Sequence, residues 1–170
     1  MIRIRPIVAS AVVAAALAFP TVGGTQGQQF SNASLQDTLS WLRNFLPAAT
    51  GAPNYYNMAM TESLDPGNGC QITLRIDTLY VANNSHVHSY ESFSLSDIDP
   101  ATVSASFFGG TGVNLVGYWT RGRASLIVDG NDTGLRLSGA GGTIGYFTDP
   151  ASAQRVANAL QHAAQLCARP

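Results

Sequence analysis

The chain has 170 residues, 45% of them apolar, and a formal net charge of −1. Its nine basic residues are all arginine and form no basic run or face, which argues against nucleic acid and anionic membrane surfaces as partners. Low charge and frequent Ser, Thr, Asn and Gly are typical of a secreted β-rich protein of about one domain.

Residues 1–24 have the order of an export signal peptide. Arg3 and Arg5 precede an apolar run over residues 7–19, which is too short to span a bilayer. Small residues follow, and we expect cleavage near Gly24 or, alternatively, after Ala18. The sequence therefore predicts a periplasmic or secreted protein that keeps no membrane anchor after cleavage.

A flexible, polar lead-in is predicted over residues 25–33, followed by a single α+β domain over residues 34–170. A helix is expected to begin at Ser34, because Ser34 and Asp37 can cap each other's backbone amides. The apolar stripe of this helix consists of Leu35, Leu39, Leu42 and Leu46. Pro47 is expected to end it, and Trp41 is interpreted as edge packing rather than as a ligand platform.

About seven strands are predicted from alternating apolar residues between turn signals. Their ranges are 55–61, 70–77, 86–94, 103–108, 113–120, an irregular stretch through 126–128, and a last hairpin of 135–138 with 143–147. Short spacing between the strands favours antiparallel pairing. We expect one antiparallel sheet or a partly closed barrel, with one helix before it and one after it.

The last helix carries the clearest pattern in the chain. Asp149 followed by Pro150 is a helix start, since the Asp side chain can accept from first-turn amides. The predicted inner stripe, mostly alanine, consists of Ala153, Val156, Ala157, Leu160, Ala163, Ala164 and Cys167. Small side chains allow close approach, so this helix is predicted to lie flat on the sheet.

Two cysteines, Cys70 and Cys167, are the only ones in the chain. An even number of cysteines in an exported protein favours a disulfide. A redox or metal-binding pair typically has C-x-x-C spacing, which this chain lacks. Cys70 begins the best-patterned strand and Cys167 ends the helix stripe, both on apolar faces. If the helix covers that strand, their Cα atoms should lie within the roughly 4.4–6.8 Å that a disulfide allows.

Two segments carry a resemblance to known proteins. One is residues 93–100, a strand that leads into the corner Leu95-Ser96-Asp97-Ile98, and the other is residues 144–167, a last strand followed by a long helix. Over residues 54–167 the chain resembles small, uncharacterised, exported bacterial proteins and is similar to pleckstrin-homology-like domains. That resemblance implies a bent seven-stranded sheet capped by the C-terminal helix. It implies no functional residue, and the lysine-rich first hairpin of phosphoinositide-binding members is missing.

Candidate sites for chemistry are few. His86 and His88 would share one face of a strand, as metal ligands do, although an exposed strand face is the favoured interpretation. Asp97 and Asp99 are interpreted as turn-forming residues rather than a catalytic pair. No nucleophile elbow or dinucleotide fingerprint is present, and no cofactor is predicted.

The sequence thus favours a non-enzymatic binding or structural module of the cell envelope, whose partner is an envelope protein or a small ligand. The alternative is a small metal- or ligand-binding enzyme that uses His86 and His88.

Overall fold

The computed structural model describes residues 30–51, 57–109, 112–120, 123–129, 131–138, 141–147 and 149–168. The predicted signal peptide, most of the lead-in and the start of the first predicted strand lie outside these ranges. The helices are α1 (Leu35–Ala49) and α2 (Pro150–Cys167), with short 3-10 turns η2 (Leu95–Asp97) and η3 (Pro100–Thr102). The strands are β1 (Met58–Pro66), β2 (Gln71–Tyr80), β3 (Ser85–Ser94), β4 (Ser104–Phe108), β5 (Val113–Trp119), β6 (Arg123–Val128), β7 (Asn131–Ser138) and β8 (Gly141–Phe147).

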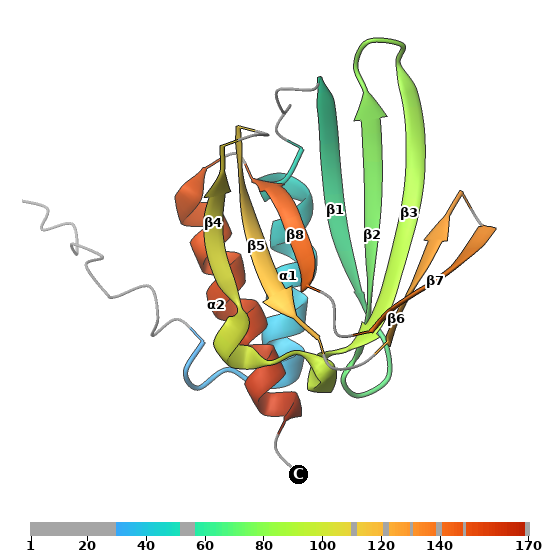
Figure 1. The fold of residues 1–170 in the computed structure, drawn as a ribbon. Helices are drawn as coiled ribbons and strands as arrows, with labels where there is room; N and C mark the ends of the chain where they lie inside the picture. Colours follow the sequence, from blue (N-terminus) through green and yellow to red (C-terminus); the bar gives the residue numbers. More distant parts are fainter. Residues whose placement is uncertain are drawn as a thin grey trace, which may run out of the picture.

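The α+β class is confirmed, but the strands form two separate antiparallel sheets rather than one sheet or a closed barrel. One sheet has the order β1-β2-β3-β6-β7, and the other has the order β4-β5-β8 (Figure 1). The two 3-10 turns after β3 redirect the chain from the first sheet to the second. Both turns are capped locally, since Ser94 and Asp99 accept from the amides of Ser96 and Ala101.

The predicted last hairpin is wrong. β7 pairs with β6 in the five-stranded sheet, whereas β8 pairs with β5 in the three-stranded sheet. The tight connection is instead the one from β6 to β7, where Val128 pairs with Asn131 and Asp129 has a φ of +47°. Asp129 thus has the left-handed backbone that a tight hairpin turn of this kind requires. Strands β7 and β8 belong to different sheets.

Helix α1 begins with the predicted capping box, in which Ser34 and Asp37 bond each other's backbone amides. It continues past Pro47 to Ala49, so the expected end at Pro47 is wrong by two residues. Pro47 lacks only its own amide and crowds the turn before it, so the residues that follow it can keep helical geometry. The Thr50 amide and hydroxyl both bond the carbonyl of Leu46 and complete the end.

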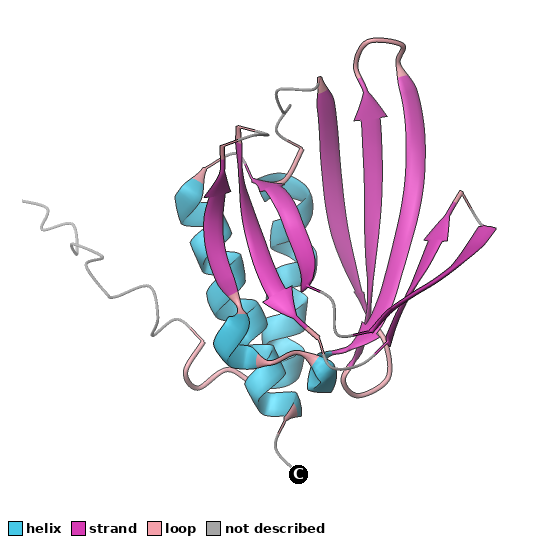
Figure 2. Cartoon of the chain, viewed as in Figure 1, coloured by secondary structure: helices cyan, strands magenta, loops and turns pink. Residues whose placement is uncertain are grey.

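Helix α2 has the predicted cap and inner stripe. Asp149 accepts from Ser152 N at 2.8 Å, and all the predicted stripe residues except the half-buried Cys167 are buried. The two helices pack against each other (Figure 2). Helix α2 covers the three-stranded sheet through β4, β5 and β8, whereas α1 contacts β1 of the five-stranded sheet. None of the described helices is both long enough and apolar enough to cross a membrane.

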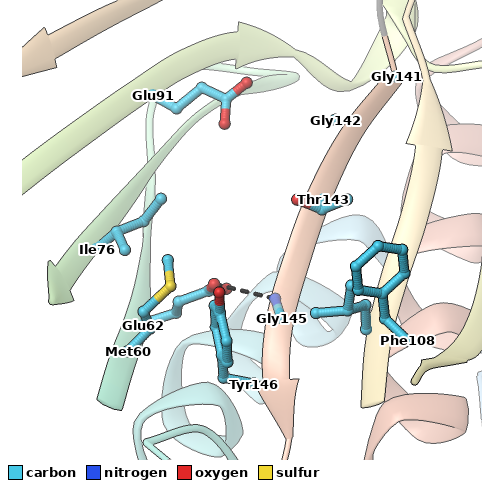
Figure 3. A pocket seen from close by; sticks show the side chains of 11 residues that line it. Met60, Glu62, Ile76, Glu91, Phe108, Gly141, Gly142, Thr143, Gly145 and Tyr146 are labelled. Carbon is cyan, nitrogen blue, oxygen red and sulfur yellow. Dashed lines mark hydrogen bonds between the residues drawn. The ribbon is translucent and has the colours of Figure 1, made fainter. Parts of the chain in front are cut away.

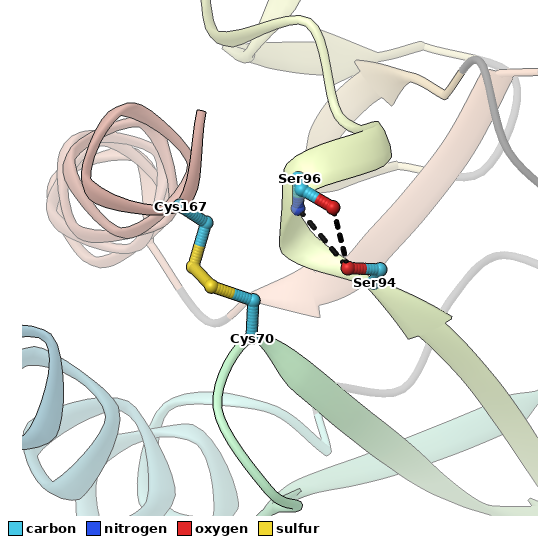
Figure 4. The surroundings of a disulfide bond; sticks show 4 residues. All are labelled: Cys70, Ser94, Ser96 and Cys167. Atoms are coloured by element: carbon cyan, nitrogen blue, oxygen red, sulfur yellow. Dashed lines mark hydrogen bonds between the residues drawn. A yellow bond between two sulfur atoms is a disulfide. The ribbon is translucent and has the colours of Figure 1, made fainter. Parts of the chain in front are cut away.

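The predicted disulfide between Cys70 and Cys167 is confirmed, with a Cα–Cα distance of 5.8 Å (Figure 4). Its setting differs from the prediction, because Cys70 lies in the turn before β2 and α2 covers the other sheet. Both cysteines are half-buried at the margin of the core rather than inside it. The bond therefore ties the helix layer of one sheet to the β1–β2 end of the other.

Trp41 packs as predicted, at the edge of the core. Its ring lies 4.9 Å from Phe30 and 4.4 Å from Phe45, and the guanidinium of Arg155 covers both Trp41 and Phe45. This cluster joins the outer sides of α1 and α2, and its aromatic faces are occupied by the protein itself.

Candidate functional site: an acidic cleft between the sheets

The two sheets meet along the unpaired edges of β1 and β8. Strand β1 has β2 on its other side, and β8 has β5. A side chain bridges the two edges, because the Gly145 amide of β8 donates to Glu62 Oε1 of β1 at 3.0 Å (Figure 3). The Glu62 amide in turn donates to the Thr50 hydroxyl at the end of α1. The Glu62 side chain thus occupies the position at which backbone hydrogen bonds would otherwise join the two sheets.

A cleft of about 360 Å³ opens beside this bridge. The five-stranded sheet contributes Met60, Glu62, Ile76 and Glu91. The three-stranded sheet contributes Phe108, Leu115, Gly141, Gly142, Thr143, Gly145 and Tyr146. Figure 3 shows the two carboxyls on one side of this space and Thr143 with the glycine-rich strand on the other. The cleft volume falls within the range usual for small-molecule sites.

Glu62 is 1% exposed, and its Oε2 atom has no hydrogen-bond partner among the residues that the structure describes. Burial raises the pKa of the Glu62 carboxyl to about 8, the Gly145 amide opposes that rise, and the negative charge of Glu91 adds to it. At neutral pH this side chain is therefore mostly a neutral carboxylic acid. Oε1 accepts from the backbone, and the other oxygen has a hydrogen-bonding capacity that the protein leaves unused.

Glu91 and Tyr118 complete the polar groups near the cleft. Glu91 is 8% exposed, and burial raises the pKa of its carboxyl. Burial, followed by the charges of Glu91 and Glu62, holds the pKa of Tyr118 well above its usual range. The Tyr118 hydroxyl is also buried without a partner among the described residues. Buried polar atoms without partners are costly, so each of these two atoms calls for an explanation such as binding or catalysis.

The β8 wall of the cleft is shaped by side chains of β5. Tyr118 pairs with Gly142, and a Cβ on Gly142 would lie 2.3 Å from the Tyr118 ring. Leu115 pairs with Gly145, where a Cβ would meet the leucine at the same distance. The register shifts between Leu115 and Asn114, which pairs with Phe147, and the extra residue, Tyr146, has a φ of +65°. A bulge of this kind re-aims a side chain, and Tyr146 lines the cleft.

The predicted candidates His86 and His88 lie on the opposite face of the same sheet. Both side chains are exposed and approach Asp77, with His86 Nδ1 at 3.0 Å and His88 Nδ1 at 3.5 Å from its Oδ1. No group of three or more His, Cys, Asp or Glu side chains in the described part of the chain is placed to hold a metal ion. A metal site at this pair stays a prediction that the arrangement does not strengthen.

Asp97 and Asp99 lie in the 3-10 turns after β3, outside the cleft. Asp99 caps its turn, as the sequence indicated.

Sequence reasoning missed Glu62 and Glu91, although a signal existed. They are the only two glutamates of the chain. Glu62 follows Met58 and Met60 on one face of β1 and precedes Leu64, and Glu91 precedes Phe93 on β3. A carboxyl at an alternation position that calls for an apolar residue is the pattern that could have found both. The first predicted strand ended at residue 61, one residue before Glu62.

The comparisons with known proteins add no name to this site: no family model, curated protein or solved structure matches the chain.

Proposed function

We propose that the protein is an exported, non-enzymatic module of the cell envelope that binds a small molecule in the cleft between its two sheets. The observation that carries this proposal is the buried, unpartnered Oε2 atom of Glu62 in the wall of that cleft. A buried carboxyl costs stability that an apolar side chain of similar size would not cost. Such a group is expected where it has a binding partner outside the chain.

Two features support action outside the cytoplasm. The order of charge, apolar run and small residues in 1–24 is that of a signal peptide, and a disulfide joins Cys70 to Cys167. N-terminal sequencing of the exported protein should give a start near Thr25, and recovery of intact Met1 in the cytoplasm would contradict export. The likeness to pleckstrin-homology-like domains stays a prediction and contributes no residue to this proposal.

An enzyme that uses His86 and His88 has weaker support. Both histidines are exposed and lie on the face away from the buried carboxyls. Among the described residues, neither of the two buried polar atoms without a hydrogen-bond partner belongs to a side chain next to these histidines.

A fragment screen on two matched tryptophan variants tests the binding proposal. Thr143 is exposed and lines the cleft, so Thr143→Trp places an indole in it without altering the core. Thr61 is exposed on β1 and faces the other surface, which makes Thr61→Trp the control. We expect small aromatic and aliphatic fragments, detected by saturation-transfer NMR, to bind the wild type and Thr61→Trp but not Thr143→Trp. Equal binding to all three proteins would overturn the proposal.

A further inference from the structure

The cleft is acidic and has no opposing positive charge in its described lining. Its ionisable lining groups are Glu62 on β1, Glu91 on β3 and the phenol of Tyr146 on β8. Two described arginines have partners away from this lining, since Arg75 pairs with Asp65 and Arg155 covers aromatic rings of α1. The chain contains no lysine. An occupant of this cleft therefore meets two carboxyls and no described cation.

The two carboxyls need more than a neutral hydrogen-bond partner. Glu62 and Glu91 lie on the same inner face of the sheet, since Glu62 pairs across to Ile76 and Glu91 pairs across to Leu74. The charge on Glu91 disfavours ionisation of Glu62, so each opposes the other in the ionised state. A cation placed between them removes this repulsion and supplies N–H donors to the unpartnered Oε2.

The rest of the lining decides which kind of cation fits. A hard metal ion such as Ca²⁺ takes about 6–8 oxygen ligands, and no described cluster of acidic side chains provides a third carboxylate. The remaining side chains are mostly hydrocarbon, namely Met60, Ile76, Phe108 and Leu115. Such a surface suits the carbon portion of a ligand, and Phe108 is exposed enough, at 55%, to contact it.

We propose that the cleft binds an organic ammonium ion, with its charged nitrogen between the carboxyls of Glu62 and Glu91 and its carbon portion against Met60, Ile76 and Phe108. This inference rests on the proposed function, because it names the class of molecule that the same cleft takes.

Binding of an ammonium ion is coupled to the release of a proton. Below about pH 8 the Glu62 carboxyl is mostly protonated, and the bound cation stabilises its ionised form. The proton released from Glu62 passes to the buffer. The Glu62 carboxylate remains paired with the ammonium ion, so the two charges neutralise each other. Of the groups that face Glu62, Glu91 also has a raised pKa, and Tyr118 remains a neutral phenol. Affinity should therefore rise with pH by up to about tenfold per unit below pH 8.

Benzylamine and benzyl alcohol form a matched probe pair, since one is cationic and the other neutral at nearly the same shape. Both are titrated into the disulfide-bonded protein from about pH 6 to 8, with amide shifts of Glu62 and Gly145 as the readout of position. Calorimetry in two buffers of different ionisation enthalpy counts the protons released. The variants are Glu62→Gln, which keeps the acceptor for the Gly145 amide, and Asp77→Asn as a control on the outer face.

We expect benzylamine to bind about tenfold or more tightly than benzyl alcohol and to release about one proton at pH 6.5. Glu62→Gln should abolish both the preference and the proton release, and Asp77→Asn should change neither. If benzyl alcohol binds in the cleft as tightly as benzylamine, the ammonium inference fails and the binding cleft stands. If neither probe shifts the Glu62 and Gly145 amides, both the inference and the proposed function are overturned.

Discussion

The two faces of the strands β1, β2 and β3 carry acidic groups in opposite settings. On the outer face Asp77 and Asp65 lie in water and have cationic or imidazole partners, namely Arg75, His86 and His88. On the inner face Glu62 and Glu91 lie among apolar side chains, and no arginine or histidine of the described residues lines their cleft.

This contrast shows that prominence in the sequence is a poor guide to chemical consequence. The His86-Val87-His88 motif attracts attention as a metal pattern, yet its side chains are hydrated and their interactions are screened. The two glutamates form no motif, but burial raises the pKa of Glu62 to about 8. Electrostatic interactions are stronger where water is excluded, and burying an ionisable group there lowers the stability of the fold.

Replacing Glu62 should have the largest effect on the contrast between the faces. The folded pKa of about 8 lies above the ordinary value of 4.5, so the native state holds a proton that the unfolded chain releases between these values. The stability that Glu62 contributes should therefore be fully present below pH 4.5 and should be lost as pH rises towards 8. Glu62→Gln lacks this loss and should be more stable than wild type by about 4–5 kcal/mol at pH 9.

Urea unfolding of both proteins across pH 4 to 9 measures this difference. Near pH 4 the two curves should nearly coincide, because the carboxyl is then protonated in both states. A constant difference in the free energy of unfolding between wild type and Glu62→Gln at every pH would show that Glu62 is ionised in the folded protein. The inner face would then carry ionised carboxylates, as the outer face does.

Removing the disulfide should have the next largest effect, because it breaks the covalent link between α2 and the turn that joins β1 to β2. Cys167→Ser should lower the free energy of unfolding of the oxidised protein by about 2–5 kcal/mol, since it reopens a long loop in the unfolded chain. Reduction of the wild type should remove most of the same advantage. Two free thiols per chain in the unfolded, unreduced wild type would contradict the bond.

The β8 wall of the cleft offers a smaller test of inner-face packing. Gly142→Ala would place a Cβ 2.3 Å from the Tyr118 ring and should destabilise the protein by about 1–3 kcal/mol. Gly141→Ala is the matched control, because its Cβ would meet the Tyr118 carbonyl at 3.5 Å and the Trp119 ring at 3.9 Å, both ordinary contact distances. Thermal unfolding compares the two variants, and equal midpoints would mean that Tyr118 does not cover Gly142.

The smallest effect is expected on the outer face. Asp77→Asn removes the partner of His86 and His88, but all three side chains are exposed. The free energy of unfolding should change by less than about 1 kcal/mol, and added salt should reduce the change further. A larger loss in urea unfolding would show that the outer cluster stabilises the sheet as strongly as buried groups do.

Local patterns were enough to predict the elements whose structure depends on neighbours in the sequence. The capping pairs at Ser34 and Asp149, the stripe of α2 and the alternation of β2 all depend on contacts within a few residues. The disulfide was also predictable, because two cysteines have only one intramolecular pairing. Pro47 was misjudged because its cost depends on its position within the last turn of α1.

Only the tertiary structure decided how the strands are grouped and which residues meet. Alternation with a period of two assigns each residue to a face, but it does not say which strands are neighbours. The sequence could therefore place Glu62 among apolar residues on β1 but could not bring it beside Gly145 of β8 or near Glu91. The division into two sheets leaves the edges of β1 and β8 facing each other, and that long-range arrangement makes the cleft.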